Sequence, residues 1–177
     1  KAYNSLQAAD IYMICVPTPF YPDTFPPKPN IEHVIKAAED IADLLKDNDI
    51  VILESTSPVG TTQLIEDTFK KRGVDLSNIY ISYCPERVLP GNIIKELVEN
   101  DRVIGGINEI SGNKVLDFYN TFVDGKIHLS DSKTAEMCKL TENSFRDVNI
   151  AFANELSILC DEEDIDVWNL IKLTNKH

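Results

Sequence analysis

Basic residues are scarce in this chain of 177 residues: 17 Lys and Arg stand against 29 Asp and Glu, which gives a formal net charge of −12 at pH 7. An acidic surface repels phosphate backbones and anionic lipid head groups, so nucleic acids and membrane surfaces are unfavourable partners. The sequence also lacks a secretory leader and any apolar run of the roughly 20 residues that a membrane span needs. We therefore expect a cytoplasmic protein that binds neither nucleic acid nor membrane.

Cysteine and histidine are too few and too dispersed for a disulfide framework or a metal site. Cys138 and Cys160 are expected on one helix, roughly 33 Å apart at 1.5 Å per residue, so they cannot share a metal ion. His33 and His128 have no Cys, Asp or second His at ligand spacing, so we expect no metal. We interpret all four cysteines as reduced and mostly structural; they are Cys15, Cys84, Cys138 and Cys160.

Five short apolar segments predict β-strands. The first three are nearly continuous in Ile, Val, Tyr and Met, which is typical of strands buried on both faces of a parallel sheet. Most of the strands are separated by segments with helical spacing of apolar residues, and this alternation predicts a doubly wound α/β fold. The predicted strands are 10–16, 50–54, 79–84, 102–106 and 126–129.

Helical patterns follow from the spacing of apolar residues and from capping residues. Asn30 is the expected N-cap of the first helix and Gly73 closes the second. After Ser130 the pattern changes: a single long helix is predicted, and Asp166 caps a further short one. Residues 17–29 contain six prolines and predict a stiff surface loop. The predicted helices are 31–45, 61–71, 92–98, 111–122 and 132–163.

Small hydroxyl residues, Pro and Gly follow each of the first three strands, in the segments 16–19, 54–60 and 84–91. In parallel α/β sheets, ligands bind outside the carboxyl ends of the strands, so these loops are candidate binding loops. Each loop alone is equally consistent with an ordinary strand-to-helix turn capped by Ser or Thr. Three such loops in succession favour a ligand site.

The phosphate-binding fingerprint GxGxxG is missing, although a complete dinucleotide-binding domain carries it in its first βα unit. The single glycine pair, Gly105-Gly106, does not open a helix in the required way. Either the chain is not a dinucleotide-binding domain, or the first half of that domain lies upstream. The start of the chain at Lys1 favours the second interpretation.

Lys139, Asn143 and Arg146 form a polar stripe on the predicted long helix. A Lys amine beside an Asn amide can donate to a developing oxyanion, and Arg can bind phosphate or carboxylate. The alternative is a solvated helix face with ion pairs. Mixed polar and apolar residues around this helix instead suggest burial on several sides, where polar groups need partners or a ligand.

Several longer strings carry a family resemblance. VPTP, ESTSPVGTT, PERVLPG, NDRVIGG, TAEMCKL and ENSFRDVNIAFANEL occur in this order along essentially the whole chain. The chain thereby resembles the UDP-glucose/GDP-mannose dehydrogenase family, whose members oxidise a nucleotide-sugar C6 alcohol to a carboxylate with two NAD. The resemblance implies the C-terminal half of a Rossmann-type NAD domain in residues 1–131. Residues 132–177 would then be the long central helix and the start of a helical middle domain.

The resemblance also implies catalytic roles. Lys139 and Asn143 match the residues that stabilise the C6 oxyanion, and Glu86 matches the carboxylate that activates water for thioester hydrolysis. Thr56 matches a residue near the reacting carbon. The nucleophilic cysteine of the family lies in a Gly-rich segment beyond His177. None of the four cysteines here has that context, so we expect the 177-residue piece to be inactive by itself.

Contacts to cofactor and substrate are implied in the same way. NAD is expected at the loops after the first two strands, through Val16, Pro17, Thr18, Ser55 and Thr56. Substrate contacts are expected from Arg87, Val88, Lys139, Asn143, Arg146 and His177. UDP-glucose enzymes of the family tend to carry PEFLREG at the third loop, where this chain has Pro90 in place of a second Glu. The resemblance therefore favours a UDP-N-acetylhexosamine, above all UDP-N-acetylmannosamine, and a homodimer formed through the long helix.

Other interpretations stay open on sequence grounds. The chain could be a non-catalytic fragment or paralogue that dimerises through its long helix, which a Gly-rich cysteine segment in the parent gene would argue against. It could act on UDP-glucose or UDP-N-acetylglucosamine. A two-electron hydroxyacid dehydrogenase has the same sheet and long helix, but has no use for PERVLPG.

Overall fold

The computed structural model describes residues 3–176 of the chain. The chain divides into two compact units, Lys1–Leu140 and Thr141–His177. The first unit holds the sheet and most of the helices, and the second holds the greater part of one long helix and one short helix. The expected division into domains at residues 131 and 132 stays a prediction.

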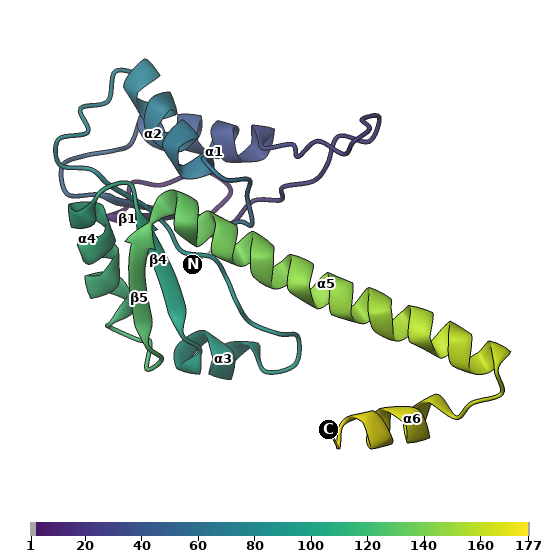
Figure 1. Ribbon diagram of the computed structural model, residues 1–177. Helices are drawn as coiled ribbons and strands as arrows, with labels where there is room; N and C mark the ends of the chain where they lie inside the picture. The colour runs from purple at the N-terminus through teal and green to yellow at the C-terminus, as the bar shows by residue number, and fades with distance from the viewer. Residues whose placement is uncertain (1–2, 177) are drawn as a thin grey trace. The chain divides into compact units, whose positions relative to one another are not determined.

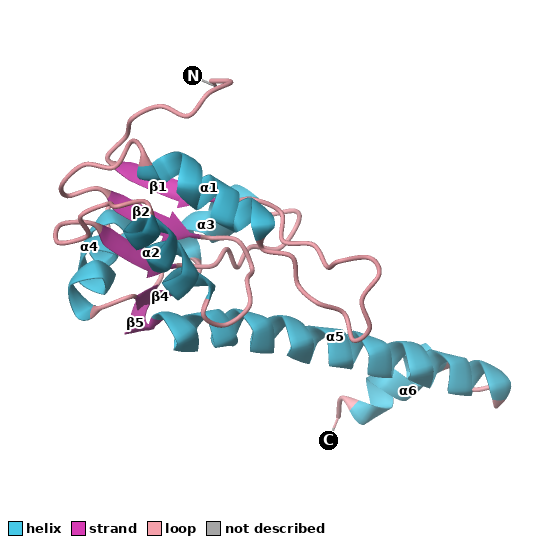
Figure 2. Cartoon of the chain, turned by 90° about the horizontal axis from the view of Figure 1, so that it is seen from above, coloured by secondary structure: helices cyan, strands magenta, loops and turns pink. Residues whose placement is uncertain are grey.

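A five-stranded sheet forms the centre of the first unit (Figures 1 and 2). The strands lie side by side in sequence order. β1, β2 and β3 are parallel, β4 runs antiparallel to β3, and β5 is parallel to β4. The predicted α/β sheet is thus confirmed in position and mostly in direction. The strands are β1 (Ile11–Ile14), β2 (Ile50–Leu53), β3 (Tyr80–Tyr83), β4 (Arg102–Gly106) and β5 (Ile127–Asp131).

The reversal at β4 departs from the parallel sheet that the alternating pattern predicted. The connection between β3 and β4, which contains α3 (Ile93–Glu99), folds back on itself. Arg87 Nη1 donates to the Asp101 carbonyl over 2.9 Å, and Asn100 Nδ2 donates to the Arg87 carbonyl over 3.3 Å. Because these bonds hold the two ends of the connection together, β4 starts at the edge where β3 ends.

Helices cover both faces of the sheet (Figure 1). α1 (Glu32–Ala42) and α2 (Thr61–Lys71) pack on one face, and α4 (Glu109–Tyr119) packs on the other. Connections between parallel strands are right-handed, so reversing the strand direction moves the connecting helix to the opposite face. The turn of the chain before β4 therefore explains why α4 lies apart from α1 and α2.

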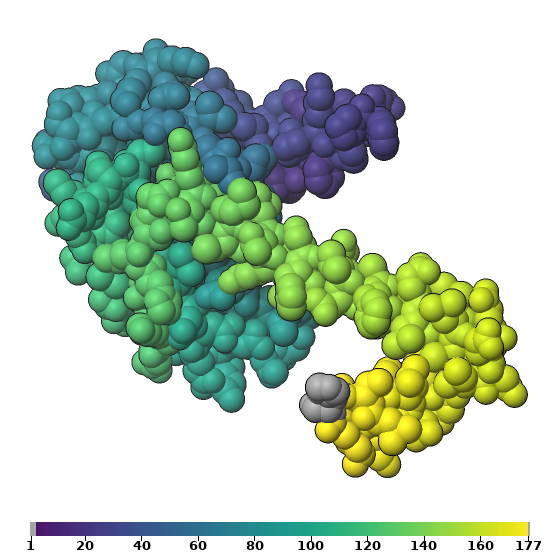
Figure 3. Space-filling model, in the orientation of Figure 1, coloured from purple at the N-terminus to yellow at the C-terminus, as the bar shows by residue number. Residues whose placement is uncertain are grey.

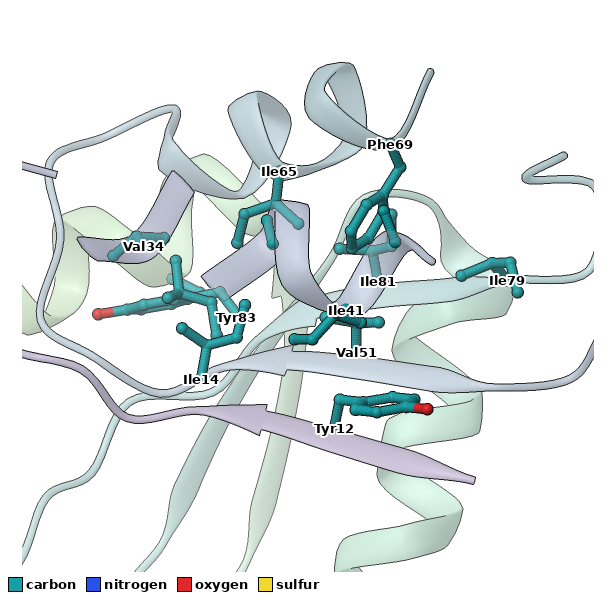
Figure 4. Packing of buried hydrophobic residues seen from close by; sticks show 14 residues of the cluster. Tyr12, Ile14, Val34, Ile41, Val51, Ile65, Phe69, Ile79, Ile81 and Tyr83 are labelled. Carbon is teal, nitrogen blue, oxygen red and sulfur yellow. The ribbon is translucent and has the colours of Figure 1, made fainter. Parts of the chain in front are cut away.

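The larger core lies between the sheet and the pair α1 and α2 (Figure 4). Phe69 and Ile65 of α2 are fully buried, and so are Val51 of β2 and Tyr83 of β3. Side chains alternate between the two faces along each strand, so Val51 faces this core whereas Ile52 faces α4. Burial of each such side chain contributes about 1.5–3 kcal/mol to the stability of the fold. This packing holds the strands, and therefore their ends, in fixed positions.

The predicted helix ends at Gly73 and Asp166 are confirmed, whereas the prediction of Asn30 as an N-cap is wrong. α2 closes with a Schellman motif: Gly73 has a φ of +79° and its N–H donates to Lys70, while the Val74 N–H donates to Phe69. Asp166 caps α6 (Val167–Thr174) as predicted, accepting from the N–H of Trp168 over 3.0 Å. At α1 the N-cap is Ile31, and Asn30 instead accepts from the Glu32 N–H.

The proline-rich loop projects from the first unit beside α1 (Figure 3). Its two sides are held together, because the Tyr21 N–H donates to Lys28 and the Asn30 N–H donates to Pro19. Phe25 is 98% exposed. The prediction of a surface loop is confirmed.

The second unit contains most of α5 (Ser132–Glu162) and all of α6. Large apolar side chains are exposed along it, among them Phe145, Val148, Phe152 and Trp168. Within residues 3–176, no helix is both long and apolar enough to cross a membrane.

Candidate active site

The loops after β1 and β2 are joined at the carboxyl edge of the sheet. Thr18 Oγ1 donates to the Thr56 carbonyl over 2.6 Å, and Ser55 Oγ donates to the Val16 carbonyl over 2.7 Å. All four residues are half-buried. The structure therefore brings together the predicted cofactor contacts of both loops.

The rest of the β2–α2 loop is fixed by its own hydroxyl groups. Ser57 is buried and its Oγ donates to the Ser55 carbonyl over 2.9 Å, and Thr61 Oγ1 donates to the Pro58 carbonyl over 2.7 Å. Gly60 has a φ of +96°, a conformation that favours glycine, and is the N-cap of α2. These contacts hold Thr56 in a rigid loop.

The loop after β3 carries Glu86, Arg87 and Val88. The Glu86 carboxylate accepts a hydrogen bond from the Val88 N–H, so the side chain folds against its own loop. The Leu89 N–H donates to Glu96 Oε2 of α3 over 2.7 Å. Helix α3 thus supports the loop that carries the predicted substrate contacts.

Lys139 of α5 reaches the β3 loop. Its Nζ donates to the Glu86 carbonyl over 2.5 Å, and both residues are half-buried. The two residues are 53 positions apart in sequence and yet lie in contact, on the same side of the sheet. The reactions assigned to them stay predictions.

Glu136, one turn before Lys139, was not among the predicted site residues. It is fully buried, and its carboxylate accepts hydrogen bonds from Gly60 and Thr62 at the start of α2. The one sequence signal for such a partner is that α2 opens at Gly60 with no acidic residue in its first turn. A helix start of this kind needs an acceptor from elsewhere.

Three predicted site residues are not placed with this group. Asn143 and Arg146 lie on α5 within the second unit, where both are exposed. His177 lies outside the described residues. Their roles stay predictions.

Comparison with known proteins assigns the chain to a family. Residues 1–123 match the NAD-binding domain of the UDP-glucose/GDP-mannose dehydrogenase family, and residues 133–177 match its central domain. The chain belongs to the UDP-glucose/GDP-mannose dehydrogenase family. The resemblance found in the sequence motifs is confirmed.

Relatives of this chain carry related names. A UDP-N-acetyl-D-mannosamine dehydrogenase of Campylobacter jejuni is 51% identical over the whole chain, which covers 45% of that relative. An NDP-N-acetyl-D-galactosaminuronic acid dehydrogenase of Ralstonia nicotianae is 47% identical over the whole chain and 43% of that relative. The solved UDP-D-ManNAc dehydrogenase of Pyrococcus horikoshii matches with a TM-score of 0.89 at 39% identity, over 97% of this chain and 40% of that protein. The chain therefore spans less than half the length of these relatives.

NAD is the cofactor of this dehydrogenase family. The loops after β1 and β2, which are joined by hydrogen bonds, fit one part of the NAD molecule. Val16, Pro17, Thr18, Ser55 and Thr56 offer hydroxyl oxygens and backbone groups, which suit the hydroxyl and amide groups of a dinucleotide. The start of α2 does not offer a phosphate site, because Glu136 already takes the N–H groups of Gly60 and Thr62. This part of the domain is thus suited to NAD groups other than the pyrophosphate.

The four cysteines of the chain all lie within the described residues and form no disulfide. Cys84 and Cys160 are buried, and burial raises the pKa of Cys84 to about 11. Cys15 is exposed as a residue, but its thiol is partly desolvated and donates to Glu54 Oε2 over 2.9 Å. Desolvation, and then the carboxylate, raise the pKa of Cys15 to about 12.

Alkylation of Cys15 should therefore be slow and should depend steeply on pH. Because only the thiolate reacts, we expect the rate to rise about tenfold per pH unit from pH 8 to 10 without levelling off near 9. Glu54→Gln removes the carboxylate that disfavours the thiolate and should raise the rate at pH 8.5 about threefold or more. The measurement is iodoacetamide labelling of the Cys15 peptide by mass spectrometry. Glu109→Gln, at an exposed site, is the control; a plateau near pH 9 would contradict the raised pKa.

Proposed function

We propose that the full-length protein containing this chain is an NAD-dependent nucleotide-sugar 6-dehydrogenase. It converts UDP-N-acetylmannosamine to UDP-N-acetylmannosaminuronate by a four-electron oxidation. The observation that carries this proposal is the hydrogen bond from Lys139 Nζ to the Glu86 carbonyl, which joins an ammonium group to the loop after β3 at the edge where parallel sheets bind ligands. The names of the relatives support the same activity.

In this proposal, Lys139 and Asn143 hold the oxygen on C6. That oxygen carries negative charge when the alcohol has lost its proton and the hydride has not yet left C6, and again when water attacks a covalent intermediate, and a fixed ammonium and amide stabilise this charge. Glu86, with its carboxylate at the end of a strand, takes the proton from water as general base. When bound, NAD supplies the hydride acceptor. Thr56 lies on the rigid loop beside the cofactor.

Arg87, Val88, Arg146 and His177 are the proposed substrate contacts, with Lys139 and Asn143. Arg87 adds a donor to the β3 loop, and Pro90 stands where UDP-glucose enzymes tend to have a carboxylate. A donor suits the carbonyl of an acetamido group, whereas a carboxylate suits sugar hydroxyls. This difference favours a UDP-N-acetylhexosamine over UDP-glucose.

Steady-state assays of the full-length protein test the proposal. We expect kcat/KM for UDP-N-acetylmannosamine to exceed that for UDP-glucose by at least about tenfold, because a site that hydrogen-bonds one group rejects analogues lacking it. Arg87→Ala should reduce the acetamido sugar's kcat/KM more than that of UDP-glucose. Given the Ralstonia relative, UDP-N-acetylgalactosamine belongs in the panel. A preference for UDP-glucose would assign the protein to another branch, and no NADH formation with any sugar would refute the activity.

A cytoplasmic location and a homodimer formed through α5 complete the proposal. The apolar side chains exposed along the second unit support a partner for this helix. Size-exclusion chromatography with light scattering of the full-length protein measures the oligomeric state directly.

A further inference from the structure

The start of α2 is completed by a residue from another helix. Gly60, its N-cap, has no side chain to accept the N–H groups of the first turn, and that turn contains no acidic residue. Glu136 of α5 supplies the acceptor from 74 to 76 positions away. One carboxylate of α5 therefore binds the N-terminus of α2.

Three donors meet the two oxygens of Glu136. Oε2 accepts from the Gly60 N–H over 2.5 Å, and Oε1 accepts from the Thr62 N–H over 2.8 Å and from Thr62 Oγ1 over 2.6 Å. Glu136 and Thr62 are both fully buried. Only a side chain with two acceptor oxygens satisfies this arrangement, because a neutral amide offers one oxygen and two donors.

Glu136 and Lys139 lie on the same turn of α5, three residues apart. This spacing corresponds to a rise of about 4.5 Å, with the two side chains on neighbouring faces of the helix. Glu136 contacts the loop after β2, and Lys139 contacts the loop after β3. One helical turn thus connects the loop that carries Thr56 to the loop that carries Glu86.

We propose that Glu136 is a positioning residue that acts through Lys139. By fixing α5 against the β2–α2 loop, Glu136 sets the place of the Lys139 ammonium relative to Thr56 and Glu86. The inference deepens the proposed function and rests on it. A misplacement of about 1 Å in such a group can cost a hundredfold in rate, so the contact matters for turnover as well as for folding.

The first test is a double-mutant cycle in the full-length protein. Glu136→Gln sets an amide donor against an N–H group, and should lower kcat about tenfold to a hundredfold with little change in the KM of the sugar. If Glu136 acts through Lys139, the same change made in the Lys139→Ala background should lower kcat by less than about twofold. Glu109→Gln, on the exposed surface of α4, is the matched control. If Glu136→Gln lowers kcat by the same factor with and without Lys139, the positioning role is overturned, because a purely structural effect does not depend on Lys139.

A second measurement does not depend on turnover. Labelling of lysines with acetic anhydride, followed by mass spectrometry, should show Lys139 reacting several-fold faster in Glu136→Gln, because its bond to the Glu86 carbonyl is weakened. Lys133, exposed at the start of α5, should be unchanged. Unchanged labelling of Lys139 would overturn the inference whatever the wild type oxidises. Changed labelling in a protein that oxidises no nucleotide sugar would refute the proposed function alone.

Thr62→Val provides a milder variant if Glu136→Gln fails to fold. It removes the Thr62 Oγ1 donor while keeping the size of the side chain and both backbone donors. A smaller change of the same sign is expected in kcat and in Lys139 labelling. No change in either quantity would contradict the positioning role.

Discussion

Replacing Lys139 with Ala in the full-length protein should lower kcat for nucleotide-sugar oxidation by about a hundredfold to a thousandfold, with a smaller effect on KM. The ammonium is held at the Glu86 carbonyl, and the proposed mechanism uses it to stabilise charge that appears only as the reaction proceeds. An interaction made in the transition state but not in the ground state affects kcat more than KM. The measurement is steady-state NADH formation with UDP-N-acetylmannosamine.

The matched control for this loss is Lys133→Ala. Lys133 is exposed and lies six residues earlier on the same helix, so the same truncation there should leave kcat within about twofold of the wild type. A Lys139→Ala protein with wild-type turnover would exclude Lys139 from the reaction.

Gly105→Ala should strongly destabilise the protein. A Cβ on Gly105 would lie 2.6 Å from the Ala135 Cβ, 2.6 Å from the Asp131 carbonyl oxygen and 2.7 Å from the Ser132 Cα. Two of these atoms belong to backbone, so the start of α5 has to move away from β4. Overpacking of this kind costs about 3 kcal/mol, which lowers the apparent Tm by roughly 6–12 °C.

Gly112→Ala is the matched control, because it makes the same chemical change inside α4. A Cβ there would have its nearest neighbour at 3.7 Å, an ordinary contact, and alanine favours a helix by about 0.5–1 kcal/mol over glycine. We expect an apparent Tm equal to or slightly above that of the wild type in differential scanning fluorimetry. Similar losses in both variants would show that the contact of Gly105 with α5 is not what matters.

The fold was predictable where its signals are local. The spacing of apolar residues between Thr61 and Gly73 determines α2, and Asp166 marks the start of α6, because caps and periodicity act within a few residues. The direction of β4 has no such signal. It depends on hydrogen bonds of Arg87 with Asn100 and Asp101, thirteen and fourteen residues further along the chain, which a pattern of strands and helices does not contain.

The candidate site was predictable to a similar extent. The rule that ligands bind at strand ends led to the three loops after β1, β2 and β3, and the family resemblance then singled out Thr18, Thr56 and Glu86 within them. Glu136 was missed because its partners lie more than 70 positions away, and an acidic residue on a long helix is usually solvated. Its importance follows from burial, which the sequence around it does not indicate.

Glu136 and Lys139 are separated by a single helical turn. The number of residues in that turn therefore affects the placement of Lys139 more than the identity of those residues does. Met137 and Cys138, which lie between Glu136 and Lys139, are exposed and half-buried, so many side chains fit there. One inserted residue would instead rotate everything after it by about 100° around the helix axis and shift it by about 1.5 Å. The ammonium would then point away from Glu86 while the carboxylate stayed at α2. The two residues between Glu136 and Lys139 therefore fix the spacing of these two side chains. Substitutions are tolerated there, whereas insertions and deletions are not.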